Sequence, residues 1–311
     1  MSKMSIKLYF LCFICVVCTE VTGQQADTVK LYEHLVAITK NEKPRNYENR
    51  ERLNEVAQYI YTVFEQYADS TYYQEFEVKA KGMHTYKNVV AVFGSNNEET
   101  IVVGAHYDVC MGTEGADDNA SGIVGLLELA RMLDGKALNY RIEMVAYTLE
   151  EPPFFRSNYM GSAQHAAALI ENKVPVYGMI CLEMIGYFDD AKKSQDYPIS
   201  ALSLIYGNKG NYITLVNKMN KGRFSRKFNR LFKGEKLIRT KKFTAPKGLP
   251  GIDYSDHLNY WKHGIPAVMI TDTAFYRNKN YHKTTDTLET LDLARMALVI
   301  DSVYKALLGM K

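Results

Sequence analysis

The sequence predicts a single globular α/β domain with a mixed, mostly parallel central β-sheet and helices on both of its faces. Short apolar runs rich in β-branched residues alternate along the chain with segments of helical apolar spacing, which is typical of parallel strands joined by crossover helices. Residues 24–311 are also long enough for one large domain with a substantial core, and no repeat or low-complexity linker divides them.

The first elements expected are two helices followed by two strands. Helical apolar spacing covers residues 28–39 and 50–67, and strand patterns cover residues 71–78 and 86–93. Two consecutive strands of this kind pair most simply as antiparallel neighbours. The sheet is therefore expected to be mixed, with antiparallel pairing at this edge.

A buried strand at residues 100–105 (TIVVGA) is expected to carry His106 and Asp108 at its carboxyl end. Residues i and i+2 share one face of a strand, so Asp108 can accept a hydrogen bond from one ring nitrogen of His106. The other nitrogen then remains for a metal. A lone His-x-Asp triplet is usually a surface turn, so this interpretation depends on residues elsewhere in the chain.

The segment 115–122 (GADDNASG) predicts a tight turn that holds Asp118 at the start of a helix at residues 123–133. An ordinary helix N-cap is the simpler explanation for an Asp at such a position. It accounts for one acidic residue but not for two adjacent ones.

The apolar run at residues 141–149 (RIEMVAYTL) predicts a strand that ends at Glu150 and Glu151, immediately before two prolines. Adjacent side chains on an extended segment point in opposite directions. Glu151 can therefore hold a metal while Glu150 stays free to accept a proton. Taken alone, two adjacent glutamates are more often a solvated loop.

A strand at residues 176–181 gains the carboxylate of Glu183 at its end, and the polar loop 281–287 (YHKTTDT) places His282 before a last helix at about residues 291–308. Two imidazoles and three carboxylates from five segments suit two zinc ions: His106, Asp118, Glu151, Glu183 and His282. Four positive charges against three negative ones leave about one unit to acidify a shared water, whose proton Glu150 would accept. No Cys ligand is implied.

The ordered motifs GAHYD, GADDNASG, LEEPPF, LEMIGY and YHKTTDT resemble the co-catalytic dizinc aminopeptidase family, whose relatives include glutamate carboxypeptidases and glutaminyl cyclases. The similarity spans about residues 106–287 and implies a zinc-exopeptidase-like fold. It implies that Asp118 is shared by two zinc ions and that Glu150 is the general base. One zinc is then completed by His106 and Glu183, and the other by Glu151 and His282.

The resemblance also implies a cis peptide between Asp118 and Asn119. At Glu183 the best-known family members carry the shorter Asp, so the second metal could bind differently here. Asp256 and His257 lie in a stretch (YSDH) that family members also show near the active site. Capping of the helix that carries Trp261 explains these two residues equally well.

The expected function is a secreted zinc aminopeptidase that hydrolyses N-terminal peptide bonds with a hydroxide shared by the two metals. Two alternatives stay open: a glutaminyl cyclase-like acyltransferase with a single zinc, and a silent binding domain. The setting of His106 and the GADDNASG turn favour the peptidase over the cyclase. The intact pair Glu150 and Glu151 argues against a binding domain without catalytic activity. The expected partners are peptides. The sequence does not fix the preferred residue, the end of the peptide attacked or the oligomeric state.

Residues 1–23 have the pattern of a signal peptide: two lysines, an apolar core at residues 8–17 and small residues before Gln24. The core is shorter than the roughly 20 residues of a membrane span. A secreted or periplasmic protein without a transmembrane span is therefore expected, and lipid attachment at Cys18 is disfavoured by the two valines before it. For Cys110 and Cys181, two free thiols are favoured over a disulfide.

The segment 218–247 contains twelve Lys or Arg and one acidic residue, whereas the whole chain has a net charge of only +3. Phe224, Phe228 and Phe232 are spaced four residues apart and predict an amphipathic helix packed on the body of the domain. A basic helix of this kind can also touch an anionic membrane or nucleic acid. We favour a solvated insertion over the sheet edge, with a lid over the substrate cleft as the alternative and no nucleic-acid partner.

Overall fold

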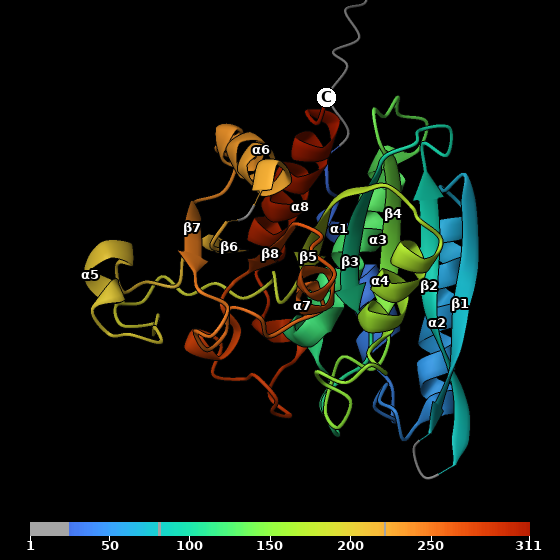
Figure 1. The fold of residues 1–311 in the computed structure, drawn as a ribbon. Helices are drawn as coiled ribbons and strands as arrows, with labels where there is room; N and C mark the ends of the chain where they lie inside the picture. The colour runs from blue at the N-terminus through green and yellow to red at the C-terminus, as the bar shows by residue number, and fades with distance from the viewer. Residues whose placement is uncertain (1–24, 80–81, 221) are drawn as a thin grey trace, which may run out of the picture.

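The computed structural model describes residues 25–79, 82–220 and 222–311 of the chain. A single eight-stranded sheet runs through its centre in the order β1-β2-β4-β3-β5-β8-β6-β7 (Figure 1). The expected signal peptide, with Cys18, lies outside the described residues. Within those described ranges, none of the helices has the length and apolar character needed to cross a membrane.

The sheet is mixed, as the sequence predicted. The neighbouring strands β4, β3, β5 and β8 are parallel, β6 and β7 are parallel to each other, and the pairs β1/β2, β2/β4 and β6/β8 are antiparallel. The strands are β1 (Ser70–Lys79), β2 (Met83–Phe93), β3 (Thr100–His106), β4 (Arg141–Tyr147), β5 (Val176–Leu182), β6 (Ile213–Lys218), β7 (Thr240–Ala245) and β8 (Ala267–Thr271).

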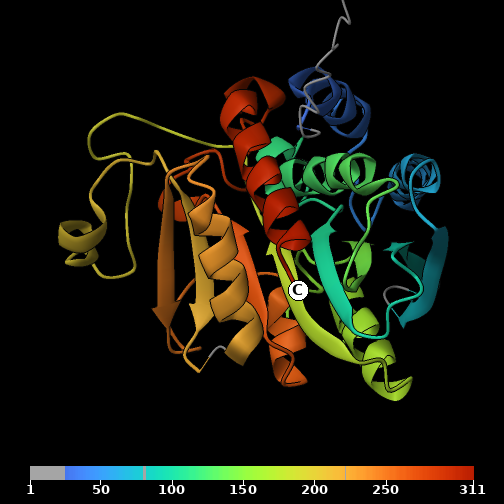
Figure 2. The same cartoon turned by 90° about the horizontal axis from the view of Figure 1, so that it is seen from above.

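Helices cover both faces of the sheet (Figure 2). Successive residues of the central strands face opposite sides, and both sides are apolar, so each needs a covering layer. On β3, Ile101 and Val103 belong to one hydrophobic core and Val102 to another. The first core includes side chains of α1 (Thr28–Thr39), α2 (Arg50–Glu65), α3 (Gly122–Leu133), α6 (Gly222–Gly234) and α8 (Leu293–Leu308). The second includes side chains of α4 (Gly161–Glu171) and α7 (His257–Lys262). The remaining turns are a π-helical turn at Ala116–Ser121, a short helix α5 (Leu202–Tyr206) that protrudes beyond β7, and 3-10 turns at Ala274–Tyr276 and Leu288–Thr290.

The basic segment 218–247 is part of the sheet and not an insertion laid over its edge, which corrects the sequence-based expectation. β6, α6 and β7 form a parallel strand-helix-strand unit, and β7 is itself the edge strand. Phe224, Phe228 and Phe232 are buried, which confirms the predicted amphipathic helix. Burying three aromatic rings requires a packed helix, and lysines such as Lys242 are typical of an exposed edge strand.

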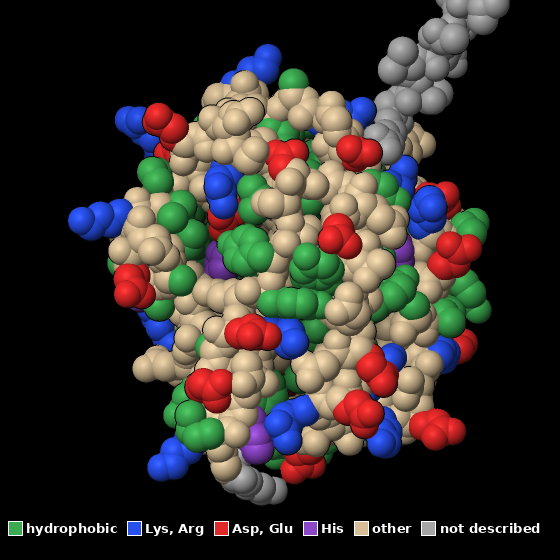
Figure 3. All heavy atoms as spheres, turned by 90° about the vertical axis from the view of Figure 1, so that its right-hand side faces the viewer, with side chains coloured by type: hydrophobic (Ala, Val, Ile, Leu, Met, Phe, Trp, Pro, Cys, Tyr) green, Lys and Arg blue, Asp and Glu red, His purple; other side chains and the backbone are tan. Residues whose placement is uncertain are grey.

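The face at the β1 edge of the sheet carries both signs of charge. Figure 3 shows acidic and basic side chains interspersed there around scattered apolar ones. This face is therefore not a single-signed basic stripe of the kind typical of nucleic-acid binding.

Candidate metal centre

The site is built where four parallel strands end. The carboxyl ends of β4, β3, β5 and β8 meet at one edge of the sheet. β4 and β5 lie on opposite sides of β3: the chain passes from β3 through α3 to β4, and then through α4 to β5. Ligands of doubly wound sheets bind in the crevice at such a reversal of strand order. His106 is the last residue of β3, the two glutamates follow β4, and Glu183 follows β5.

The five expected ligands come together as two groups that share Asp118. His106 Nε2 lies 3.4 Å from Asp118 Oδ1 and 3.5 Å from Glu183 Oε2. His282 Nε2 lies 3.2 Å from Asp118 Oδ2 and 3.3 Å from Glu151 Oε2. Ligand atoms bound to tetrahedral zinc at about 2.0–2.1 Å stand roughly 3.3 Å apart. Both groups therefore have the spacing of a zinc site, with one oxygen of Asp118 directed to each.

The chemistry of these atoms also fits a divalent cation. Among the described residues, His106 Nε2 and Glu151 Oε1 are buried without a hydrogen-bond partner, although buried polar atoms nearly always have one. Burial alone would lower the pKa of His106, but Glu150 and Glu183 raise it well above its usual value. Burial and the carboxylate of Asp118 raise the pKa of Glu151 to about 7. A cation in each group would give both atoms a partner and offset the crowded negative charge.

Glu150 lies beside these groups without belonging to either of them. Its Oε2 is 3.9 Å from His106 Nε2, and burial, reinforced by Glu151, raises the pKa of Glu150 well above its usual range. β4 ends at Tyr147, and Leu149 has a φ of 60°. Both glutamates consequently turn into the same site, whereas the sequence predicted opposite faces of a longer strand.

Asp108 has a wider structural role than the one predicted. The nearer partner of His106 Nδ1 is the backbone oxygen of Asp108 at 3.2 Å, while the Asp108 carboxylate oxygen Oδ1 lies 3.5 Å away. The two carboxylate oxygens accept hydrogen bonds from the backbone N–H groups of Glu150 and Glu151, each at 3.1 Å. Asp108 therefore positions the glutamate pair as well as the imidazole.

The turn that carries Asp118 is tied to the end of β5. The peptide between Asp118 and Asn119 is cis, as the resemblance implied. The Asn119 side chain donates to the backbone oxygen of Leu182 at 2.9 Å and accepts from the backbone N–H of Met184 at 3.0 Å. These bonds flank Glu183 and fix its position relative to Asp118. Asp117 points elsewhere and accepts hydrogen bonds from Gly186 and Asn278.

Asp286 supports the site and was missed by the sequence-based reasoning. Its two carboxylate oxygens accept hydrogen bonds from the backbone N–H groups of Asp117 and Asp118, each at 3.0 Å. Asp286 lies in the same loop as His282, so it couples that loop to the turn carrying Asp118. The YHKTTDT motif contains this residue, but a loop rich in hydroxyl side chains gave no reason to select it.

Replacing Asp286 with Asn should weaken zinc binding by about 10- to 100-fold, the usual cost of losing a residue that orients metal ligands. The amide can accept through only one atom, so one of the two N–H groups loses its partner. Zinc affinity would be measured by competition with a chromophoric chelator. Asp292→Asn, which alters the cap of α8, is the matched control. Unchanged affinity in Asp286→Asn would show that Asp286 does not position Asp118.

The YSDH segment borders Glu183. Ser255 donates a hydrogen bond of 2.6 Å to Glu183 Oε2. Asp256 does not cap α7, because its side chain makes no capping bond there, and both of its carboxylate oxygens are buried without a partner among the described residues. Burial raises the pKa of Asp256 to about 7. His257 is structural: its Nε2 lies 2.8 Å from the Ile252 carbonyl oxygen, and burial lowers its pKa to about 4.

Comparisons with known proteins agree with this architecture. The chain is 42% identical to the uncharacterized protein YfbL of Escherichia coli over 298 residues, which cover 93% of this chain and 90% of YfbL. It is 26% identical to leucine aminopeptidase 1 of Uncinocarpus reesii over 226 residues, 67% of this chain and 51% of that protein.

Among solved structures, the fold is similar to that of a Fimbriiglobus ruber glutaminyl cyclase, with a TM-score of 0.70, 17% identity, and coverage of 92% of this chain and 96% of that one. The family model for peptidase family M28 matches residues 88–307, which include every expected site residue. That match covers more than half of the chain, so the protein belongs to peptidase family M28.

Proposed function

We propose that this protein is a zinc-dependent aminopeptidase that removes residues from the N-terminus of peptides. The observation that carries the proposal is the pair of ligand groups joined through Asp118, with Glu150 beside them. His106, Asp118 and Glu183 would hold one zinc ion, and Asp118, Glu151 and His282 the other. Bound zinc would polarise the scissile carbonyl group and acidify water.

Glu150 is the proposed general base and the proton carrier to the leaving nitrogen. It lies outside the two groups joined through Asp118, although its carboxylate is also within 4.8 Å of ligand atoms of His106 and Glu151, and it is buried. Burial raises the pKa of Glu150 well above its usual range, which makes its carboxylate a stronger base than an exposed glutamate. Asp108 would act on the reaction only through the positions of Glu150, Glu151 and His106.

The charge of the site favours an amino end over a carboxyl end of the substrate. Besides the ligands, the buried carboxyl groups of Glu150 and Asp256 lie near the same imidazole. A substrate ammonium group would be attracted to these carboxylates, whereas a terminal carboxylate would be repelled. This sign of charge supports aminopeptidase action over carboxypeptidase action.

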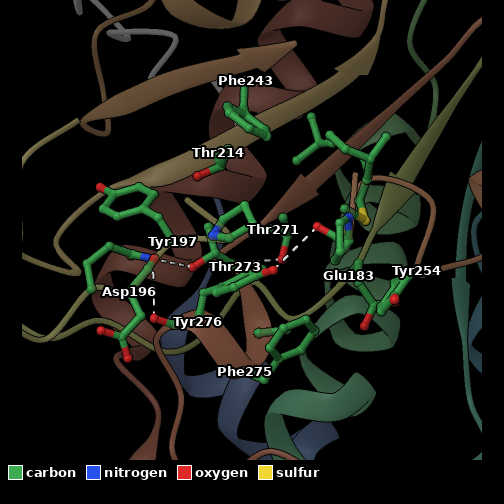
Figure 4. A pocket seen from close by; sticks show the side chains of 18 of the residues that line it. Glu183, Asp196, Tyr197, Thr214, Phe243, Tyr254, Thr271, Thr273, Phe275 and Tyr276 are labelled. Carbon is green, nitrogen blue, oxygen red and sulfur yellow. Dashed lines mark hydrogen bonds between the residues drawn. The ribbon is translucent and has the colours of Figure 1, made fainter. Parts of the chain in front are cut away.

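A cavity next to Glu183 offers space for the first side chain of the substrate (Figure 4). Its volume is about 790 Å³, a value that includes space open to solvent. Its walls come from the segment before α5, from β6, β7 and β8, and from the loops after β8. Most of the lining is aromatic or apolar: Tyr197, Tyr206, Tyr212, Val216, Phe243, Tyr254, Met269, Phe275, Tyr276 and Tyr281. Such a cavity would accept a large apolar or aromatic side chain.

Lys241 also lines this cavity without making it a strongly cationic pocket. Its Nζ lies 3.5 Å from the centre of the Tyr212 ring, so its charge is directed at an aromatic face. Burial, together with Arg239 and Arg277, lowers the pKa of Lys241 to about 8. β7 of the basic segment thus shapes the proposed substrate cavity through Lys241 and Phe243.

A panel of aminoacyl p-nitroanilides tests the function. We expect Leu, Met and Phe substrates to be hydrolysed about 10-fold or more faster than Gly substrates, because a filled apolar pocket discriminates by at least this factor. A chelator should abolish the activity and added Zn²⁺ should restore it. A peptide beginning with Gln separates the cyclase alternative, which releases ammonia and leaves peptide bonds intact. The zinc-loaded protein contradicts the proposal if it cleaves none of the panel.

We also propose that the protein is exported. The charged and apolar pattern of residues 1–23 supports this, as does the small-residue stretch before Gln24.

A further inference from the structure

A cysteine thiol lies beside one of the two ligand groups. Cys110 Sγ, a carboxylate oxygen of Glu151 and a ring nitrogen of His282 all lie within 4.8 Å of one another. Cys110 comes from the loop after β3, four residues beyond His106, and is 6% exposed. The thiol is therefore enclosed together with two of the side chains proposed to hold zinc.

A second observation indicates that this corner of the site takes a cation. Glu151 Oε1 is buried, the residue being 4% exposed, and it has no hydrogen-bond partner among the described residues. A buried carboxylate oxygen in that state needs a positive partner. Cys110 and Cys181 are both free thiols, as favoured from the sequence. Cys181 differs because its sulfur lies 3.2 Å from Ser255 Oγ and has a polar neighbour of its own.

We infer that the zinc ion held by Glu151 and His282 takes the thiolate of Cys110 as a further ligand. The inference rests on the proposed function and revises the expectation that no Cys ligand is used. Zinc binds Cys sulfur at about 2.3 Å, and the Cys110 sulfur already lies within 4.8 Å of the ligand atoms of Glu151 and His282. As the sulfur-metal bond forms, the thiol S–H bond breaks and its proton leaves to solvent, without any change of oxidation state.

A thiolate ligand makes the two metal positions chemically different. The position of His106 and Glu183 offers only nitrogen and oxygen, whereas the position of Glu151 and His282 offers nitrogen, oxygen and sulfur. Softer ions prefer sulfur, so this second position should favour Zn²⁺, Co²⁺ and Cd²⁺ over Mn²⁺ or Mg²⁺.

Cobalt substitution tests the inference without relying on activity. In a chain with Cys12, Cys15 and Cys18 replaced by serine, only Cys110 and Cys181 can supply a thiolate. We expect the Co²⁺-loaded protein to show a thiolate-to-cobalt charge-transfer band in the near ultraviolet. The band should be retained in Cys181→Ala and lost in Cys110→Ser. Visible cobalt bands and metal analysis would show in each variant that cobalt is bound.

The outcomes separate this inference from the proposed function. Cobalt that binds to the chain without a near-ultraviolet band, or with a band that persists in Cys110→Ser, overturns the thiolate ligand and leaves the metallopeptidase intact. A chain that binds neither Co²⁺ nor Zn²⁺ overturns the proposed function itself. The spectra of the serine-background chain and of Cys181→Ala decide the question even if Cys110→Ser fails to fold.

Discussion

Replacing Glu150 with Gln should leave the zinc content of the protein unchanged while kcat falls by about 10² to 10⁴, the usual contribution of a general base. Gln has nearly the same shape as Glu but cannot accept a proton at neutral pH. The two groups joined through Asp118 do not include Glu150, whose Oε2 lies 3.9 Å from His106 Nε2. The substitution therefore separates proton transfer from metal binding.

The measurements are kcat on the best p-nitroanilide, zinc content by elemental analysis and the melting temperature. Glu289→Gln is the matched control, because that glutamate is exposed on the surface and pairs with Lys40. Near-normal turnover in Glu150→Gln would remove the assignment of Glu150 as base. Loss of zinc together with turnover would instead make Glu150 a metal ligand.

The parts of the fold that the sequence predicted have strong periodic patterns. The helix expected at residues 28–39 coincides with α1, and the strand expected at residues 100–105 falls within β3. β6, β7 and β8 were not predicted. β8 is a five-residue apolar run, which a buried helical segment would match equally well, and β7 is a half-exposed edge strand containing two lysines.

The convergence of the five expected ligand residues was predictable because each follows a recognisable strand or lies in a distinctive loop, but the contacts that support them were not. Asp286 bonds to the backbone of Asp118 across 168 residues, and no local pattern reports such a pairing. The prediction that the Glu150 and Glu151 side chains point in opposite directions was wrong for a similar reason. The positive φ of Leu149 has no sequence signature in a non-glycine residue. For Cys110, the sequence predicted only a free thiol.

Asp118→Ala is expected to abolish activity and to weaken zinc binding by more than the roughly 100-fold upper range expected for Asp286→Asn. Asp118 contributes one oxygen to each ligand group, so its removal leaves each zinc ion with two protein ligands of that set. The ion at His106 and Glu183 would then keep one imidazole and one glutamate, too few for the three-ligand sites that hold catalytic zinc. The other ion would keep Glu151, His282 and the inferred thiolate of Cys110, but it would lose the carboxylate shared with the first ion.

Thermal stability reports this loss independently of turnover. A ligand that binds only the folded state stabilises it by about 2.7 kcal/mol at 100 times its dissociation constant, so zinc should raise the melting temperature of the wild type and chelation should lower it. Asp118→Ala should show a much smaller response to either treatment than the wild type. Asp134→Asn, at the exposed C-cap of α3, should respond like the wild type. A full zinc response in Asp118→Ala would mean that the two groups bind metal without Asp118. It would contradict the proposal that this carboxylate is shared by both ions.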